Sequence, residues 1–274
     1  MGNNHSPNSS HSPLAFFVLV FALSLPIWLI GSVWPLELLP GLPASSFMVL
    51  CPVIAASVLV YIKEKSAGVV QLLKRSFDYG RIQAKVWYLP AIFLWPGIAF
   101  LAYGVMRLMR MPLPTPQFPG LATLGMFVVF FIAALGEELG WSGYVIDPMQ
   151  KRWGALQAAI ILGIVWAAWH IVPWLQVGRS PTWIAWQCLA LVSSRVLYVW
   201  IYNNAGKSVF ITALGHAMLN VSWQLFPNQG SHYDPRITGL LTAFAAVMVT
   251  VVWGTQMVTR KRNRLRVEFQ GGID

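Results

Sequence analysis

Three apolar segments of the chain each carry side chains of the kind that hydrolases use. Glu137 and Glu138 are adjacent in one segment, His170 lies in the next, and His216 and Asn220 lie four residues apart in a third. A carboxylate can hold and deprotonate a water molecule, and imidazole and amide groups can orient that water or donate hydrogen bonds to a developing oxyanion. Together these residues predict hydrolysis of an acyl bond.

Each residue taken alone also has a structural interpretation. A lone histidine such as His170 is more often a core side chain bonded to a backbone carbonyl, and asparagine and histidine often join helices within membranes. Trp166 precedes His170 by four residues, so both lie on one helical face. Adjacent helical residues point about 100° apart. We therefore expect one of Glu137 and Glu138 to face the site and the other to bond a neighbouring helix.

The segments that carry these residues are long and apolar. Of the 274 residues, 57% are hydrophobic and 10% are charged, against about 25% charged in soluble domains, which excludes a soluble or a disordered chain. We predict an all-α polytopic integral membrane protein of about eight transmembrane helices, because a spanning helix needs about 20 apolar residues. The predicted spans are 14–34, 46–62, 87–107, 122–146, 155–177, 182–202, 208–226 and 237–258.

These spans form one predicted domain, 14–258, whose motifs fall within 122–226. A disordered tail, 1–13, precedes it, and a basic cytoplasmic tail, 259–274, follows it. Of 19 lysines and arginines, 14 lie in the C-terminal tail and the loops after the second, fourth and sixth spans, and 4 lie on the opposite side. The positive-inside rule therefore places both termini in the cytoplasm, and we expect the plasma membrane as the location.

The net charge of +10 is explained by these loops. No soluble region carries a basic stripe with interleaved aromatic residues, so we predict no nucleic-acid partner. Cys51 and Cys188 both lie in apolar runs, which indicates neither a disulfide framework nor a cysteine-rich metal site.

At these motifs the sequence resembles the CPBP family of intramembrane proteases, the CAAX-processing and bacteriocin-processing proteins also called Abi. The family includes type II CAAX prenyl endopeptidases and lysostaphin-resistance-like proteins. Its pattern is E-E-x-x-x-R, then F-x-x-x-H, then H-x-x-x-N or B, on successive helices. The matching residues here are Glu137-Glu138, Trp166 to His170 with tryptophan for phenylalanine, and His216 to Asn220. The stretch 200–208 also resembles the family's W-x-Y-N-x-T-G-x-S lead-in to the third motif.

The resemblance implies a role for each residue. Glu137 and His170 would activate a water molecule, His216 and Asn220 would form an oxyanion hole, and Glu138 would be a supporting carboxylate. The substrate would be a membrane-associated protein or peptide, prenylated or leader-bearing, met at the lipid bilayer. The pattern leaves the cofactor open: Glu137, His170 and His216 could hold Zn²⁺, whereas asparagine is a poor zinc ligand, which favours a metal-free reaction.

One position departs from the family pattern. Ser142 stands where the family has arginine, one helical turn after Glu138, so the expected cation beside that carboxylate is missing. Arg195, deep in the sixth span, is the basic residue at membrane depth that has no assigned role. We predict that Arg195 pairs with Glu138, and that Arg195 and Trp166 are supporting residues of the site.

Three other functions remain open. Residues 140–143 read as the G-x-S-G motif of rhomboid proteases, which would make Ser142 a nucleophile with a histidine base but would leave both glutamates without a role. A catalytically silent immunity or scaffold protein could share the fold. A proton-coupled transporter would also place glutamate and histidine within the membrane, although no inverted repeat with broken helices is apparent.

Overall fold

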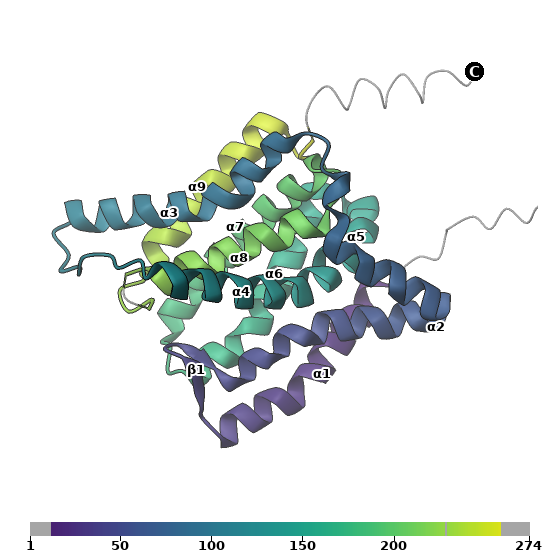
Figure 1. Cartoon of the computed structure of the whole chain (residues 1–274), viewed down its shortest axis with the longest axis horizontal. Coiled ribbons are helices and arrows are strands. Elements are labelled where there is room, and N and C mark those ends of the chain that lie inside the picture. The colour runs from purple at the N-terminus through teal and green to yellow at the C-terminus, as the bar shows by residue number, and fades with distance from the viewer. Residues whose placement is uncertain (1–11, 228, 259–274) are drawn as a thin grey trace, which may run out of the picture.

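A computed structural model describes residues 12–227 and 229–258, which form a bundle of long helices with one short hairpin (Figure 1). The α-helices are α1 (Pro13–Val33), α2 (Cys51–Lys74), α3 (Tyr88–Leu108), α4 (Gly120–Gly140), α5 (Ile146–Trp153), α6 (Ala155–Gln176), α7 (Pro181–Asn204), α8 (Val209–Leu225) and α9 (Pro235–Trp253). The shorter elements are strands β1 (Glu37–Leu39) and β2 (Leu42–Pro43), the 3₁₀ helices η1 (Ala44–Leu50), η2 (Arg75–Arg81) and η3 (Lys85–Trp87), and a π-helical turn, Trp141–Val145.

The predicted all-α membrane architecture is confirmed. Within the described residues, seven helical segments are long and apolar enough to cross a membrane. The seventh predicted span corresponds to α8, which at 17 residues is too short to count among them. The outer helices expose large apolar side chains, including Phe100 and Leu121, as expected for surfaces that face lipid.

Several boundaries differ from the prediction. The fourth predicted span, 122–146, continues as α4, the π-helical turn and α5 as far as Trp153. The second, 46–62, begins within η1 and runs on as α2 to Lys74, with a backbone break at Lys65, whose φ is 58°. Ser12 caps α1 by accepting a hydrogen bond from the Ala15 amide. The rest of the predicted N-terminal tail and the predicted basic tail, 259–274, lie outside the described residues.

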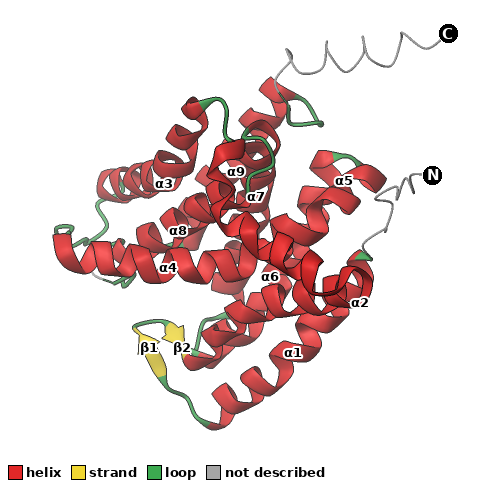
Figure 2. Ribbon diagram, turned by 45° about the vertical axis from the view of Figure 1, so that its right-hand side comes forward, coloured by secondary structure: helices red, strands yellow, loops and turns green. Residues whose placement is uncertain are grey.

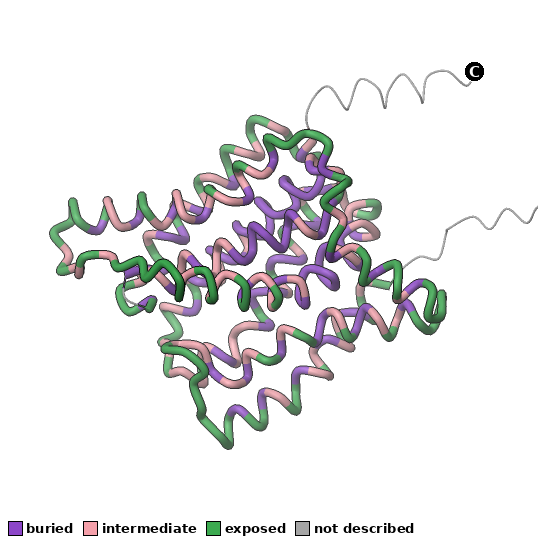
Figure 3. Tube along the Cα trace, viewed as in Figure 1, coloured by how far each residue is buried: buried purple, intermediate pink, exposed green. Residues whose placement is uncertain are grey.

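Helices α6, α7 and α8 lie at the centre of the bundle (Figure 3). Of the 18 most apolar consecutive residues of α7, 72% are buried, against 28% in α1. Figure 3 shows the same gradient, with buried residues concentrated in the middle helices and exposed residues on the outer ones. The centre therefore packs protein against protein, and α1, α2, α3 and α9 form the perimeter.

Two glycines let helices approach each other around the predicted motifs. A Cβ atom at Gly140, at the end of α4, would lie 2.7 Å from the carbonyl oxygen of Pro52 in α2. A Cβ atom at Gly163 in α6 would lie 2.9 Å from the Cα of Val192 in α7. Any larger residue at these positions would push the helices apart, so the glycines set the spacing of the helices that carry Glu137 and His170.

The β1–β2 hairpin lies at the end of the bundle away from α5 (Figure 2). Its turn contains Gly41, whose φ of 75° suits glycine, and the Gly41 amide donates a hydrogen bond to the Glu37 carboxylate. The sequence did not predict this hairpin.

Candidate active site

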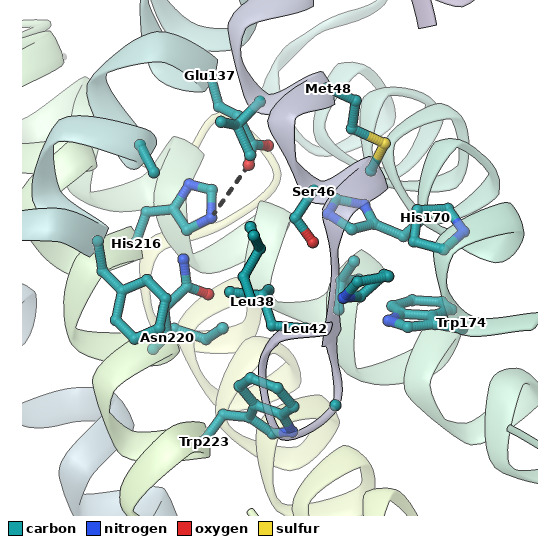
Figure 4. A pocket seen from close by; sticks show the side chains of 18 of the residues that line it. Leu38, Leu42, Ser46, Met48, Glu137, His170, Trp174, His216, Asn220 and Trp223 are labelled. Atoms are coloured by element: carbon teal, nitrogen blue, oxygen red, sulfur yellow. Dashed lines mark ion pairs between the residues drawn. The ribbon is translucent and has the colours of Figure 1, made fainter. Parts of the chain in front are cut away.

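A cavity of ≈ 240 Å³ inside the bundle is lined by Glu137, His170, His216 and Asn220 (Figure 4). These are the four residues predicted to be catalytic, and they come from three helices, α4, α6 and α8. Trp166, predicted as a supporting residue, lines the same cavity. Most of the remaining wall is aromatic or aliphatic and includes Trp174, Trp183, Trp223, Phe130, Leu42 and Leu191.

The Glu137 carboxylate is held by two tryptophans. The indole Nε1 of Trp166 donates a hydrogen bond of 2.7 Å to Glu137 Oε2, and that of Trp141 donates one of 3.2 Å to the same oxygen. The other oxygen, Oε1, lies 3.9 Å from His216 Nε2 (Figure 4). One carboxylate oxygen is thus fixed by the protein, and the second is directed at His216.

Trp141 is a site residue that the sequence analysis missed. In the G-x-S-G interpretation it is only the variable position of the motif. Its spacing carried a usable signal, because Trp141 follows Glu137 by four residues and therefore shares its helical face.

His216 connects the two glutamates. Its Nδ1 lies 3.1 Å from Glu138 Oε1, and because a carboxylate accepts hydrogen bonds, Nδ1 carries the proton and donates. The other ring nitrogen, Nε2, is left to face Glu137 Oε1. Asn220 follows one turn later in α8 and lines the cavity, and its amide has no hydrogen-bond partner among the described residues.

His170 is held by its own helix and by aromatic rings. Its Nδ1 lies 2.8 Å from the carbonyl oxygen of Trp166, so Nδ1 donates and Nε2 is available to the cavity. The imidazole stacks on Trp174 with ring centroids 5.5 Å apart and meets Trp169 edge-on at 5.0 Å. In the described part of the chain, His170 has no ion pair with a carboxylate within 4.0 Å. His170 therefore shares the cavity with Glu137 without touching it.

Glu138 lies in a separate buried cluster. Arg195 Nη1 donates hydrogen bonds of 3.0 Å and 2.9 Å to the two oxygens of Glu138, and neither side chain is exposed. The predicted Arg195–Glu138 pair is confirmed. The guanidinium carbon of Arg195 also lies 4.3 Å from the ring centre of Trp166 and 5.2 Å from that of Tyr198. Both rings stabilise the cation through their π-electrons.

Ser142 belongs to this cluster as well. Its hydroxyl donates a hydrogen bond to Glu138 Oε2. Ser142 does not line the cavity, and the described residues include no histidine that bonds to it. This geometry gives no support to the rhomboid-like serine–histidine dyad.

The described side chains do not provide a ready zinc site. Among residues 12–227 and 229–258, no group of three histidine, cysteine, aspartate or glutamate side chains is close enough to hold a metal ion. Glu137 and His216 approach each other, but His170, the third candidate ligand, stands apart. The geometry offers two donors from the predicted set where a structural or catalytic zinc ion takes at least three.

Known proteins match this chain across the helices that form the cavity. Residues 119–222 match the family model described as Type II CAAX prenyl endopeptidase Rce1-like. The chain is also 25% identical to CAAX prenyl protease 2 of Methanococcus maripaludis over 266 residues, which covers 87% of this chain and 93% of the relative. The predicted resemblance to type II CAAX prenyl endopeptidases is confirmed. Both similarities support a peptidase that is an integral membrane protein.

Proposed function

We propose that this chain, which resembles type II CAAX prenyl endopeptidases across its central helices, is an intramembrane endopeptidase in which Glu137 activates water. One observation carries the proposal: Glu137, His170, His216 and Asn220, which lie up to 83 residues apart in the sequence, line one cavity. A carboxylate, two imidazoles and an amide around one cavity are the groups that hydrolysis of a peptide bond needs.

The contacts suggest how the work is divided. Glu137 Oε2 accepts hydrogen bonds from Trp166 and Trp141, so Oε1 is the oxygen that takes a proton from water. The hydroxide oxygen then bonds to the carbonyl carbon of the substrate, and the carbonyl oxygen becomes an oxyanion. The unpartnered Asn220 amide donates to that oxyanion.

The histidines complete the reaction. In this step His216 carries a proton on Nε2 as well as on Nδ1, so that Nε2 donates a hydrogen bond to the oxyanion together with Asn220. His170 accepts a hydrogen bond from the attacking water at Nε2 and so orients it. When the carbon–nitrogen bond breaks, the proton held by Glu137 passes to the departing amine. Every proton is returned, and no redox partner is required.

The relative's name, CAAX prenyl protease 2, suggests prenylated proteins as a substrate class. An apolar cavity wall rich in tryptophan suits a lipid-modified or strongly apolar peptide. We propose a membrane-associated protein or peptide as the substrate, met within the bilayer.

The decisive experiment replaces Glu137 by glutamine, which keeps the shape of the side chain but cannot accept the proton. Cleavage of a fluorogenic farnesylated CAAX peptide by the purified protein should fall by about 10²–10⁴-fold, the usual contribution of a positioned base. Glu64→Gln is the matched control, because Glu64 is exposed and lies outside the cavity, and it should leave the rate unchanged. Full activity in Glu137→Gln would overturn the proposal.

A chelator tests the choice between a metal-free reaction and zinc. We expect cleavage by the wild-type protein to survive prolonged treatment with a strong chelator, because the proposed chemistry uses only side chains and water. Loss of activity that added Zn²⁺ restores would reassign Glu137 and the histidines as metal ligands.

A further inference from the structure

We infer that Arg179 binds a carboxylate of the substrate at the end of the cavity that the hairpin forms, about three residues from the cleaved bond. The inference rests on the proposed function, because it assigns a second contact with the substrate to the same cavity. Three features point to this role: the place of the Arg179 guanidinium, its lack of an anionic partner, and the length of the cavity.

Arg179 lies in the loop between α6 and α7, at the hairpin end of the cavity. Its guanidinium carbon lies 4.8 Å from the ring centre of Trp183. A Cβ atom at Gly41, in the hairpin turn, would lie 3.0 Å from Arg179 Nη2 and 3.5 Å from Cζ2 of Trp223. Gly41, Trp183 and Trp223 all line the cavity. Figure 4 shows Trp223 beside the hairpin segment that carries Leu42, at the end of the cavity away from Glu137.

The Arg179 guanidinium has no anionic partner among the described residues. In that part of the chain three arginines are at least partly buried, namely Arg75, Arg179 and Arg195. Arg75 lies 3.6 Å from Asp78 and Arg195 pairs with Glu138, whereas no described carboxylate lies within 4.0 Å of Arg179. A partly buried cation has lost hydration that an anion must replace. Arg179 is therefore ready to accept an anion from outside the chain.

The chemistry of the position selects a carboxylate. The guanidinium group is planar and presents several donors in a geometry that matches a carboxylate. Its attraction to an anion is strengthened beside the apolar rings of Trp183 and Trp223, where water is partly excluded. The hairpin's own carboxylate, on Glu37, is exposed and accepts a hydrogen bond of 2.8 Å from the Gly41 amide. In an unmodified polypeptide the matching anion is the C-terminal carboxylate or the side chain of aspartate or glutamate.

The length of the cavity places this carboxylate relative to the cleaved bond. His216, beside Glu137, and Trp223, beside the hairpin turn, are seven residues apart in α8. At 1.5 Å per residue of helix this is about 10 Å. An extended peptide advances about 3.3 Å per residue, so about three residues separate a carboxylate at Arg179 from a peptide bond at Glu137.

Peptide binding tests the role of Arg179 without requiring cleavage. Fluorescence polarisation would give the Kd of labelled farnesylated peptides for the detergent-solubilised protein, in a Glu137→Gln background. One peptide pair differs only in ending as a C-terminal carboxylate or as a carboxamide. A second pair consists of carboxamides whose last residue is glutamate or glutamine. The protein variants are Arg179→Gln, Arg179→Lys and the matched control Arg107→Gln, which removes an exposed arginine outside the cavity.

We expect the protein with Arg179 intact to bind the C-terminal carboxylate about 10- to 100-fold more tightly than the carboxamide, as charge-assisted hydrogen bonds usually contribute. Arg179→Gln should bind both with the Kd of the carboxamide, and Arg107→Gln should keep the full preference. Arg179→Lys keeps the charge but not the planar donor group, so part of the preference should remain. A preference for glutamate over glutamine that Arg179→Gln abolishes would identify an acidic side chain as the source of the carboxylate.

Four results would overturn the inference. These are no binding of any peptide, no preference within either pair, a preference that survives in Arg179→Gln, and an equal loss in Arg107→Gln. If Arg179→Gln does not fold, an undiminished preference in Arg179→Lys would count against the inference in the same way. Since binding does not need the Glu137 carboxylate, the Glu137→Gln rate assay separates failure of the proposed chemistry from failure of carboxylate recognition.

Discussion

Glu137 in the cavity and Glu138 in the buried cluster are adjacent in the sequence, yet their carboxylates lie in opposite environments. Glu138 is surrounded by Arg195, Ser142 and His216, and each of its oxygens is bonded. Glu137 is held on one oxygen by neutral indoles, and its other oxygen lies 3.9 Å from the nearest imidazole nitrogen. A fully paired charge contributes to structure, whereas a carboxylate with one oxygen directed into a cavity retains the capacity to take a proton.

The helix itself produces this contrast. Neighbouring residues in α4 point about 100° apart, so Glu137 is directed at α6 and the cavity while Glu138 is directed at α7. His216 touches both regions through its two ring nitrogens. The carboxylate that we propose as the base and the ion-paired carboxylate are thus linked through one imidazole, which is oriented by its hydrogen bond to Glu138.

We expect the largest effect on stability from removing Arg195, the cation that pairs with Glu138. Arg195→Ala leaves Glu138 buried without its cationic partner and should lower the free energy of unfolding by about 3–5 kcal/mol. Melting in detergent would measure the loss. Adding Ser142→Arg to this variant should recover much of it, because position 142 lies one turn from Glu138 and already contacts it. An unchanged melting temperature in Arg195→Ala would mean that the ion pair does not stabilise the fold.

Asn220→Ala tests the role of a side chain that lines the cavity next to Glu137. If the amide donates to the oxyanion, this variant should lower kcat for the farnesylated peptide by about 10²–10³-fold. The melting temperature should stay at the wild-type value, because the Asn220 amide has no hydrogen-bond partner among the described residues to lose. A lower melting temperature with full activity would show instead that Asn220 stabilises the fold and does not act in hydrolysis.

The smallest expected effect belongs to Ser142→Ala. This change removes one donor from Glu138 but leaves Arg195 and His216 in place, so it should cost about 1–2 kcal/mol of stability. Activity should be close to that of the wild type, and a fluorophosphonate probe should not label the wild-type protein. Covalent labelling that Ser142→Ala abolishes would restore the serine mechanism.

Much of the fold was predictable because each span is a long apolar run bounded by polar residues. The site was predictable in part because the i, i+4 spacing of Trp166 and His170, and of His216 and Asn220, fixes which side chains share a helical face. The Arg195–Glu138 pair followed from two observations: this chain lacks the arginine that the family pattern has at position 142, and Arg195 is a cation at membrane depth, which needs a partner.

Other features depend on tertiary contacts that no local pattern encodes. The π-helical turn at Trp141–Val145 widens the helix where periodicity predicts an ordinary span. The hairpin consists of five strand residues with no alternation long enough to detect. The break in α2 falls at Lys65, where neither glycine nor proline marks it. The separation of His170 from Glu137 depends on the tertiary arrangement that also allows Trp166 of α6 to bond to Glu137 of α4.

The Arg195–Glu138 pair has a consequence for how relatives of this protein are found. The family pattern places the cation on the same helix as the carboxylate, whereas here α7 supplies it across the bundle. Positions 142 and 195 should therefore vary together during descent, with arginine at one and a small neutral residue at the other. A sequence motif that requires arginine at position 142 would reject such chains, although their buried carboxylate still has a cationic partner. The position of the cation in the fold therefore identifies them better than the residue type at one motif position.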